Sequence, residues 1–313
     1  MTIRMFWSLL KESAISWSDD YAPSMGAALA YYTLFSLAPL LVIVIAIAGL
    51  LFGHEAANGE IESQLHDLIG KEGAIAVQGL LRSASEPAGS ITASMIGTAL
   101  MLVGATSVFG ELQSALDRIW RVPPSENDSF GLWGLLRSRL LSFGMILTIG
   151  FLLLVSLVVS AVLSAAGAWW GPVAAEWAPV LQAANFAASL TIVTLLFALI
   201  YKILPRVQVA WRDVWMGAAV TALLFTLGKS VIGLYLGRSG IASSFGAAGS
   251  LVALLVWVYY SAQIFLFGAE FTWVYAHRLG SFAGREEPVV PAIPSRSDAG
   301  EEQPESRTTT TGR

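Results

Sequence analysis

The sequence contains long apolar segments that are almost free of charged side chains, and this feature limits the possible folds most strongly. An α-helix rises about 1.5 Å per residue, so about 20 apolar residues cross the ~30 Å hydrocarbon core of a bilayer. Six segments reach this length. The predicted spans lie at about 24–52, 88–110, 140–168, 181–204, 214–236 and 246–275. None alternates as a membrane β-strand does, so we expect an all-α, polytopic membrane bundle with six transmembrane helices.

Composition excludes several other classes of protein. With 55% hydrophobic and 13% charged residues, the chain has too few charges to cover the surface of a soluble domain of 313 residues. Cysteine is absent, which excludes disulfides, thiolate nucleophiles and cysteine-based metal sites. The sequence also lacks a phosphate-binding glycine loop, a nucleophile elbow and an HExxH motif. We therefore expect no enzymatic activity, no cofactor, no metal site and no nucleic-acid partner.

The distribution of lysine and arginine predicts the orientation of the spans. The N-terminal segment, the second and fourth connections and the C-terminal segment together carry 14 of these residues, whereas the opposite loops carry three. Lysine and arginine accumulate on the cytoplasmic side of membrane proteins. Both termini are therefore predicted to be cytoplasmic, in a multi-pass protein of a bacterial cytoplasmic membrane.

Three segments are predicted to lie outside the spans of the transmembrane domain, which covers residues 21–278. Residues 1–20 resemble an interfacial helix, because Phe6, Leu9 and Leu10 share one helical face. Residues 54–87 form an external loop with short amphipathic helices. Residues 279–313 are rich in polar and charged side chains and are predicted to be a disordered tail.

Ionisable side chains inside apolar spans are costly, so each one is a functional candidate. Glu111 ends the second span and Glu270 lies near the cytoplasmic end of the sixth, at about the same level. Held close together, the two carboxyl groups would share a proton and serve proton-coupled transport. Alternatively, each carboxylate accepts hydrogen bonds from arginine and tryptophan groups at that end of the bundle.

Lys229 is the third ionisable candidate. It lies 15 residues into the fifth span, which places it in the outer half of the bilayer if the predicted orientation is right. Its ammonium group needs an acceptor, and Asn185 in the fourth span or Ser243 and Ser244 are candidates at matching depth. An anionic ligand headgroup would also serve, and the long side chain would otherwise reach toward the membrane surface.

Other polar or small residues interrupt the apolar spans. Tyr31, Tyr32, Tyr259, Tyr260 and Gln263 are candidates to line a ligand path, although most buried tyrosines simply find a hydrogen-bond partner.

The fifth span carries Gly217, Gly228, Gly233 and Gly237, the last two as a GxxxG pattern. These small residues favour close packing of the fifth and sixth spans over a broken helix that lines a path.

Several motifs in order resemble the YihY/BrkB family of bacterial inner-membrane proteins. They are Trp17-Ser-Asp-Asp20, Gly26 to Pro39, Phe109 to Leu116 with Ile119-Trp120, Trp211 to Trp215, Leu227-Gly-Lys229, Gly233 to Gly237 and Tyr259 to Phe271. The resemblance covers roughly residues 10–278. It implies a six-span bundle with links to envelope biogenesis and, in some members, to serum resistance of pathogens. Its motif positions include Asp19, Asp20, Tyr31, Tyr32, Glu111, Lys229, Gln263 and Glu270.

The sequence leaves two main functional hypotheses open. The first is transport or translocation of a lipid or other envelope component, with membrane lipids as partners and an anionic amphiphile as substrate. The second is a non-transporting scaffold that organises envelope proteins. A membrane-bound ribonuclease, a label that this family has carried, is the least favoured reading because no exposed set of metal-binding side chains is evident.

Overall fold

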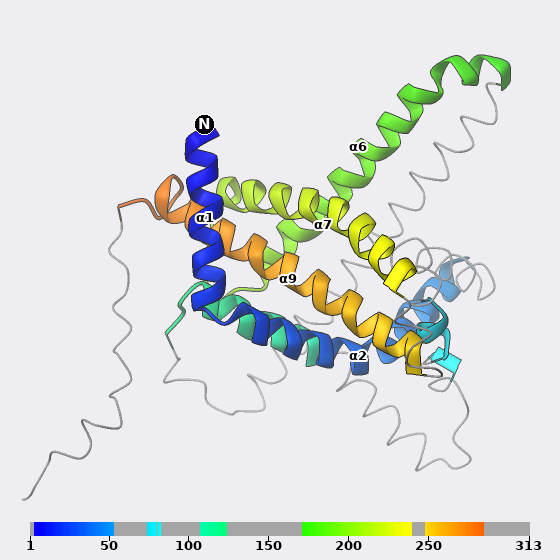
Figure 1. Cartoon of the computed structure of the whole chain (residues 1–313), viewed down its shortest axis with the longest axis horizontal. Coiled ribbons are helices and arrows are strands. Elements are labelled where there is room, and N and C mark those ends of the chain that lie inside the picture. The colour runs from blue at the N-terminus through cyan, green and yellow to red at the C-terminus, as the bar shows by residue number, and fades with distance from the viewer. Residues whose placement is uncertain are drawn as a thin grey trace, which may run out of the picture.

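The computed structural model describes residues 3–52, 74–79, 81–82, 107–123, 171–239 and 248–284, and no strand occurs in these ranges. The helices are α1 (Ile3–Asp19), α2 (Ala22–Phe52), α6 (Gly171–Ile203), α7 (Trp211–Ser239) and α9 (Gly249–Arg278), shown in Figure 1. A further helix covers residues 107–119. The predicted all-α class is therefore confirmed for the described part of the chain.

Three of the described helices are long and apolar enough to cross a membrane. The candidate spans are Phe186–Ile203, Trp211–Leu236 and Gly249–Arg278, which correspond to the predicted fourth, fifth and sixth spans. The predicted first span falls on α2, a helix of 31 residues. The predicted third span, 140–168, lies outside the described residues, as does 88–106 of the second. Six spans and cytoplasmic termini stay predictions.

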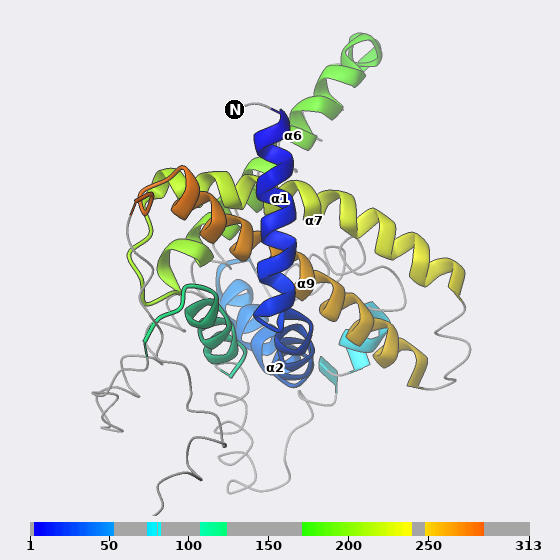
Figure 2. The same ribbon diagram turned by 60° about the vertical axis from the view of Figure 1, so that its left-hand side comes forward.

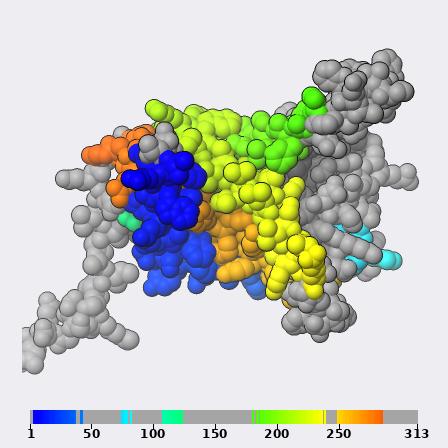
Figure 3. Space-filling model, turned by 45° about the horizontal axis from the view of Figure 1, so that its top comes forward, coloured from blue at the N-terminus to red at the C-terminus, as the bar shows by residue number. Residues whose placement is uncertain are grey.

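Helix α9 is the centre of the described part. It packs against α7 on one side and α2 on the other, while α1 crosses it (Figures 1 and 2). Its second half, from Gly268 to Ala276, is buried at every position. In the space-filling view, α1 and α7 flank α9 on one face of the molecule (Figure 3).

Helices α7 and α9 run antiparallel and meet through two reciprocal glycine–threonine contacts. A Cβ atom at Gly217 would lie 1.7 Å from Thr272 Oγ1, and one at Gly268 would lie 1.8 Å from Thr221 Oγ1. Each threonine hydroxyl donates to a carbonyl four residues earlier in its own helix, at 2.7 Å. Small residues let the backbones approach, and the hydroxyls that fill the space already have acceptors.

Gly233, the first glycine of the GxxxG pattern, does not take part in this close approach. Gly233 is exposed, and a Cβ atom there would meet nothing within 4 Å. Closer to the middle of α7, Gly228 does face α9, since a Cβ atom there would lie 2.6 Å from Ile264 Cδ1. Of the fifth-span glycines that the sequence expects to pack against the sixth span, Gly217 and Gly228 therefore contact α9 and Gly233 does not.

Tyr201 joins α6 to the α7–α9 pair. Its hydroxyl donates to the carbonyl of Phe265 at 2.7 Å and lies 3.1 Å from Thr221 Oγ1. Its ring is 5.2 Å from that of Phe265, between centroids. The side chain is almost fully buried, so its polar tip requires these partners.

We expect Tyr201→Phe to lower the free energy of unfolding by about 1 kcal/mol, the net value of one buried hydrogen bond. The ring and its packing remain, so the loss reports the hydroxyl alone. Thermal unfolding of the full chain in detergent measures it. The matched control is Tyr259→Phe, because the Tyr259 side chain is 38% exposed. Equal losses in the two variants would contradict the role given to the Tyr201 hydroxyl.

Helix α1 has the bounds predicted for the interfacial helix, but its predicted apolar face packs against protein. Leu9 is 2% exposed, and the ring of Phe6 lies 6.0 Å from that of Phe271 in α9. The opposite side of α1 exposes Trp7 and Ile15.

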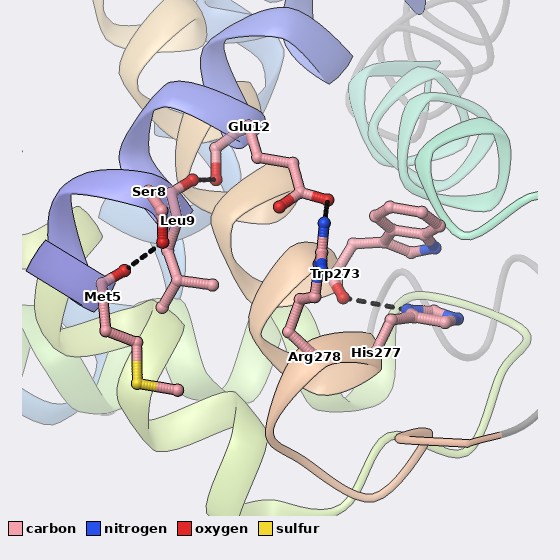
Figure 4. Close-up of polar contacts among 8 residues, drawn as sticks. Met5, Ser8, Leu9, Glu12, Trp273, His277 and Arg278 are labelled. Atoms are coloured by element: carbon pink, nitrogen blue, oxygen red, sulfur yellow. Dashed lines mark hydrogen bonds and ion pairs between the residues drawn. The ribbon is translucent and has the colours of Figure 1, made fainter.

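An ion pair further fixes α1 to α9. Arg278 Nη2 lies 3.0 Å from Glu12 Oε1 (Figure 4). The crossing of α1 over α9 therefore has both an apolar and a charged contact.

The ordered chain continues past the predicted start of the disordered tail at residue 279. Ser281 donates from its backbone N and its hydroxyl to Asp213 Oδ2, at 2.9 and 2.6 Å. The ring of Phe282 lies 5.3 Å from His277 and 5.8 Å from Trp120. Residues 279–284 are thus held by contacts with α7 and the 107–119 helix, which sequence composition alone did not indicate.

Candidate functional site

Two side chains of α9, Glu270 and the partly buried Gln263, have buried polar atoms whose usual hydrogen-bond partners are missing among the described residues. Glu270 is 0% exposed, and neither of its carboxylate oxygens has an N–H or O–H donor there. The amide oxygen and nitrogen of Gln263 are also buried and unpartnered. Seven residues separate them, which is about two turns, so both lie on one face of α9. Because buried polar groups in native structures are normally bonded, such exceptions mark candidate sites.

The surroundings of Glu270 are charged. The Asp20 carboxyl group and the Arg121 guanidinium group both lie close enough to act on it electrostatically. Asp20 lies in the turn between α1 and α2, and Arg121 follows the 107–119 helix. The Arg121 guanidinium also lies over the Trp273 ring, 4.3 Å from its centroid. Three separate parts of the chain therefore bring charged groups to one point.

Backbone strain occurs at the same place. The described residues include two non-glycine residues with positive φ, Tyr21 at 57° and Arg121 at 50°. A left-handed conformation costs about 1–2 kcal/mol for such residues, and strain of this kind clusters at functional sites. Tyr21 directly follows Asp20, so both strained residues adjoin the Glu270 cluster.

Gln263 faces α2 at a position where only glycine fits. A Cβ atom at Gly26 would lie 2.0 Å from Gln263 Nε2. Gly26 follows Asp20 by six residues on α2, and Gln263 precedes Glu270 by seven on α9. The polar groups therefore extend along the antiparallel contact of the two helices. We call Asp20, Arg121, Gln263 and Glu270 the α2–α9 polar seam.

The sequence suggested that Glu111 pairs with Glu270, whereas the structure places Asp20 beside Glu270. Glu111 is partly buried on the 107–119 helix, but the carboxyl group that acts on Glu270 is that of Asp20. Sequence reasoning treated Asp20 as the polar end of the interfacial helix, because it precedes the first charge-free run. The Trp17-Ser-Asp-Asp20 motif was the available signal for its role.

The four candidate tyrosines differ in their exposure. Tyr31 and Tyr32 are 58% and 40% exposed on α2, with their rings 5.7 Å apart. Tyr259 is also exposed. Tyr260 is partly buried, and a Cβ atom at Gly228 would lie 3.0 Å from its hydroxyl. Tyr260 thus belongs to the α7–α9 contact.

Lys229 is exposed on α7, next to Gly228. Large apolar side chains are exposed on the same part of the helix, among them Leu227 and Val231. Of its predicted acceptors, Asn185 belongs to α6 but its side chain lies outside the described part, as do residues 243 and 244. Lys229 therefore lies on a largely apolar helix surface, separate from the α2–α9 polar seam.

Comparison with known proteins identifies the family. The profile of the family described as Virulence factor BrkB matches residues 15–289. The chain belongs to the BrkB family. This confirms the resemblance inferred from the sequence motifs. No solved structure matches the chain.

Curated relatives of this BrkB-family protein have a membrane-protein name without a stated activity. A "UPF0761 membrane protein" of Pseudomonas aeruginosa is 28% identical over 252 residues, which cover 80% of this chain and 58% of the relative. One of Neisseria meningitidis serogroup B is 28% identical over 258 residues, covering 81% and 60%. The chain thus spans less than two thirds of the length of these relatives.

Other charged groups at the same end of the BrkB-family bundle have ordinary structural partners. Asp117 accepts a hydrogen bond from the Arg206 backbone at 2.8 Å, and the Arg206 side chain lies 3.2 Å from its second oxygen. Lys202 donates to the carbonyl of Val209. Glu270 differs from these groups because it is fully buried and its oxygens have no N–H or O–H donor among the described residues.

Proposed function

We propose that this BrkB-family protein translocates a lipid or related amphiphile with an anionic headgroup across the bacterial cytoplasmic membrane, with both of its termini in the cytoplasm. The exposed Lys229 carries this proposal. Its cationic side chain lies on a candidate membrane helix beside exposed Leu227 and Val231. A lysine in an apolar span costs about 2.5–3.5 kcal/mol at the helix centre unless it finds an acceptor. An anionic headgroup supplies that acceptor while its acyl chains contact the apolar side chains.

The position of Lys229 along α7 supports such a role. It precedes Leu236, the last residue of the candidate span, by seven residues, or about 10 Å of helical rise. A lysine at this depth extends its ammonium group toward the headgroup region. An anionic headgroup bound to Lys229 would lie deeper in the membrane than the other headgroups. This lowers the free-energy barrier to its further movement along α7.

A non-transporting scaffold is the second candidate, and the exposed side of α1 favours it. Trp7 is 70% and Ile15 52% exposed on a helix whose other side packs against α9. Such residues suit contact with a partner protein or with the lipid surface. A scaffold of this kind moves no lipid, so a flux measurement separates the two proposals.

The test uses the full chain in vesicles that contain a fluorescently labelled phosphatidylglycerol, with a membrane-impermeant quencher to report its transfer between leaflets. We expect transfer above the rate of protein-free vesicles, a large loss in Lys229→Met, and recovery in Lys229→Arg. Arg238→Met is the matched control, because Arg238 is an exposed cation in the last turn of the same helix. Transfer at the protein-free rate would rule out lipid translocation, and an unchanged rate in Lys229→Met would remove Lys229 from it.

A further inference from the structure

We infer that Asp20 and Glu270 form a proton-binding site, and that proton uptake at this site drives translocation by the protein. The first half of this inference rests on the geometry of the polar seam. The second half rests on the proposed function. Two measurements therefore test them separately.

Burial without hydrogen-bond donors is the first observation. Glu270 is 0% exposed, and neither carboxylate oxygen has an N–H or O–H donor among the described residues. The Asp20 carboxyl group lies near enough to hydrogen-bond to Glu270, and two carboxyl groups can do so only when one of them carries a proton. A carboxylate without water or hydrogen-bond donors is highly unfavourable, and neutralisation by a proton removes most of that cost. Side chains elsewhere at this end, such as Asp213 and Asp117, have donors that stabilise their negative charge.

The charge of the cluster is the second observation. The Asp20 carboxyl group lies within hydrogen-bonding reach of Glu270, and Arg121 is the described cation that acts on Glu270. Glu270 is fully buried, while Asp20 and Arg121 are partly buried. Among these three described groups, two carboxylates and one guanidinium leave one net negative charge, and a single proton removes it. Two carboxyl groups held close share such a proton instead of both being ionised.

Gln263 supplies a third, independent observation. Both of its amide atoms are buried and unpartnered, and they lie about two turns from Glu270 on the same face of α9. An amide offers both a hydrogen-bond donor and an acceptor, so Gln263 can bond a water molecule or a ligand on this face of α9 without being protonated itself. The polar seam thus continues from Glu270 to the level of Gly26, so the carboxyl pair is not an isolated polar end of the helix.

Three charged or titratable groups on elements near α9 have partners other than Glu270. On α7, Asp213 accepts hydrogen bonds from Ser281. On α1, Glu12 pairs with Arg278. On α6, the Tyr201 hydroxyl donates to the Phe265 carbonyl. Of the groups named here, only Asp20 and Arg121 act electrostatically on Glu270.

A proton fits this site better than a metal cation. A sodium or calcium ion needs about six oxygen ligands, and the seam offers two carboxyl groups with Gln263 about two turns away. A positive guanidinium beside the pair opposes a second cation. Uptake forms one O–H bond on a carboxylate oxygen with a proton from water, and release breaks that bond and returns the proton to water.

Chemical labelling tests the site without any transport assay. N,N′-dicyclohexylcarbodiimide is apolar and reacts with protonated carboxyl groups inside membranes, adding the acid O–H across a C=N bond and rearranging to a stable acylurea. We expect mass spectrometry of the full chain in vesicles to find the label on Glu270 or Asp20, with less label as the pH rises. Glu270→Gln should lose the label at that position, and Asp20→Asn should change its pH dependence.

Glu12→Gln is the matched control for labelling, because Glu12 is a partly exposed carboxylate, paired with Arg278, near the same end of α9. It should leave the label unchanged. Thermal unfolding of each variant confirms that it is folded. No label on Asp20 or Glu270 at any pH would overturn the proton site. Protection from label by sodium chloride, but not by choline chloride, would overturn it in favour of a sodium site.

Coupling is measured with labelled phosphatidylglycerol in the same vesicles under an imposed pH gradient. We expect the gradient to accelerate transfer in the wild type and to have no effect in Glu270→Gln. An equal rate of lipid transfer with and without the pH gradient in the wild type would overturn the coupling. Carbodiimide labelling without any lipid transfer would contradict the proposed function while it supports the proton site.

Discussion

Gly217→Ala is expected to lower the free energy of unfolding by about 1–3 kcal/mol, the usual cost of an extra methyl group in a filled interface. The added Cβ atom would lie 1.7 Å from Thr272 Oγ1 and 2.7 Å from Thr272 Cβ. Thr272 cannot turn away easily, since a β-branched side chain in a helix is stiff and its hydroxyl already donates to Gly268 O. The helices α7 and α9 must therefore separate at their closest contact.

The matched control is Gly233→Ala in the same helix. A Cβ atom there would meet nothing within 4 Å, so the variant should be neutral or gain up to about 1 kcal/mol from the better helix propensity of alanine. Chemical unfolding of the full chain in mixed detergent micelles compares the two. Equal behaviour of Gly217→Ala and Gly233→Ala would show that the glycine–threonine contact does not hold the helices together.

A second substitution tests the pairing directly. All three atoms nearest to the added Cβ of Gly217→Ala belong to Thr272, so Thr272→Gly should restore much of the lost stability. The reciprocal pair behaves differently. At Gly268 the Tyr201 hydroxyl also lies 2.7 Å from an added Cβ, so Thr221→Gly should restore less of the loss in Gly268→Ala. Non-additivity of this kind is the signature of direct contact.

The sequence predicted positions along the helix axes better than the sides that the helices turn to each other. The apolar runs located the three candidate spans, because span length follows from bilayer thickness. These helices are apolar on all sides, however, so hydrophobic periodicity does not indicate which side faces protein. Gly217 and Thr272 meet only through the register between two helices, whereas the GxxxG pattern at Gly233 is visible within one helix.

The same limit explains the outcome for the carboxyl groups. Counting residues along the spans placed Glu111 and Glu270 at the same depth in the membrane. The same depth does not mean contact, because each helix can be rotated about its axis so that the two side chains point apart. Asp20 reaches Glu270 because the turn at Tyr21, with its positive φ, brings the end of α1 against α9. No glycine occurs in that turn, so the sequence does not indicate a left-handed residue there. The Trp17-Ser-Asp-Asp20 motif marked the position, and only the three-dimensional arrangement assigned the partner.

Asp213→Ala is expected to lower the free energy of unfolding by about 2–3 kcal/mol, since hydrogen bonds to a charged acceptor are stronger than neutral ones. Asp213 is 1% exposed in the first turn of α7, and its Oδ2 atom accepts both the backbone N–H and the hydroxyl of Ser281. The substitution leaves these two donors of Ser281 without their acceptor. It also opens space beside Gly280, where Asp213 Oδ1 lies 2.3 Å from the position of a Cβ atom.

The loss should also be local, because the Asp213 contact holds the chain that follows α9. We expect trypsin to cleave faster after Arg278 in Asp213→Ala than in the wild type, together with a lower midpoint of chemical unfolding. Glu12→Ala is the control, because it removes a second link to the same end of α9. Its partner Arg278 is 65% exposed, and exposed ion pairs contribute about 0–1 kcal/mol. If Glu12→Ala destabilised the protein as much as Asp213→Ala, charge near the end of α9 would matter more than the buried hydrogen bonds of Asp213, and the anchoring role of Asp213 would be wrong.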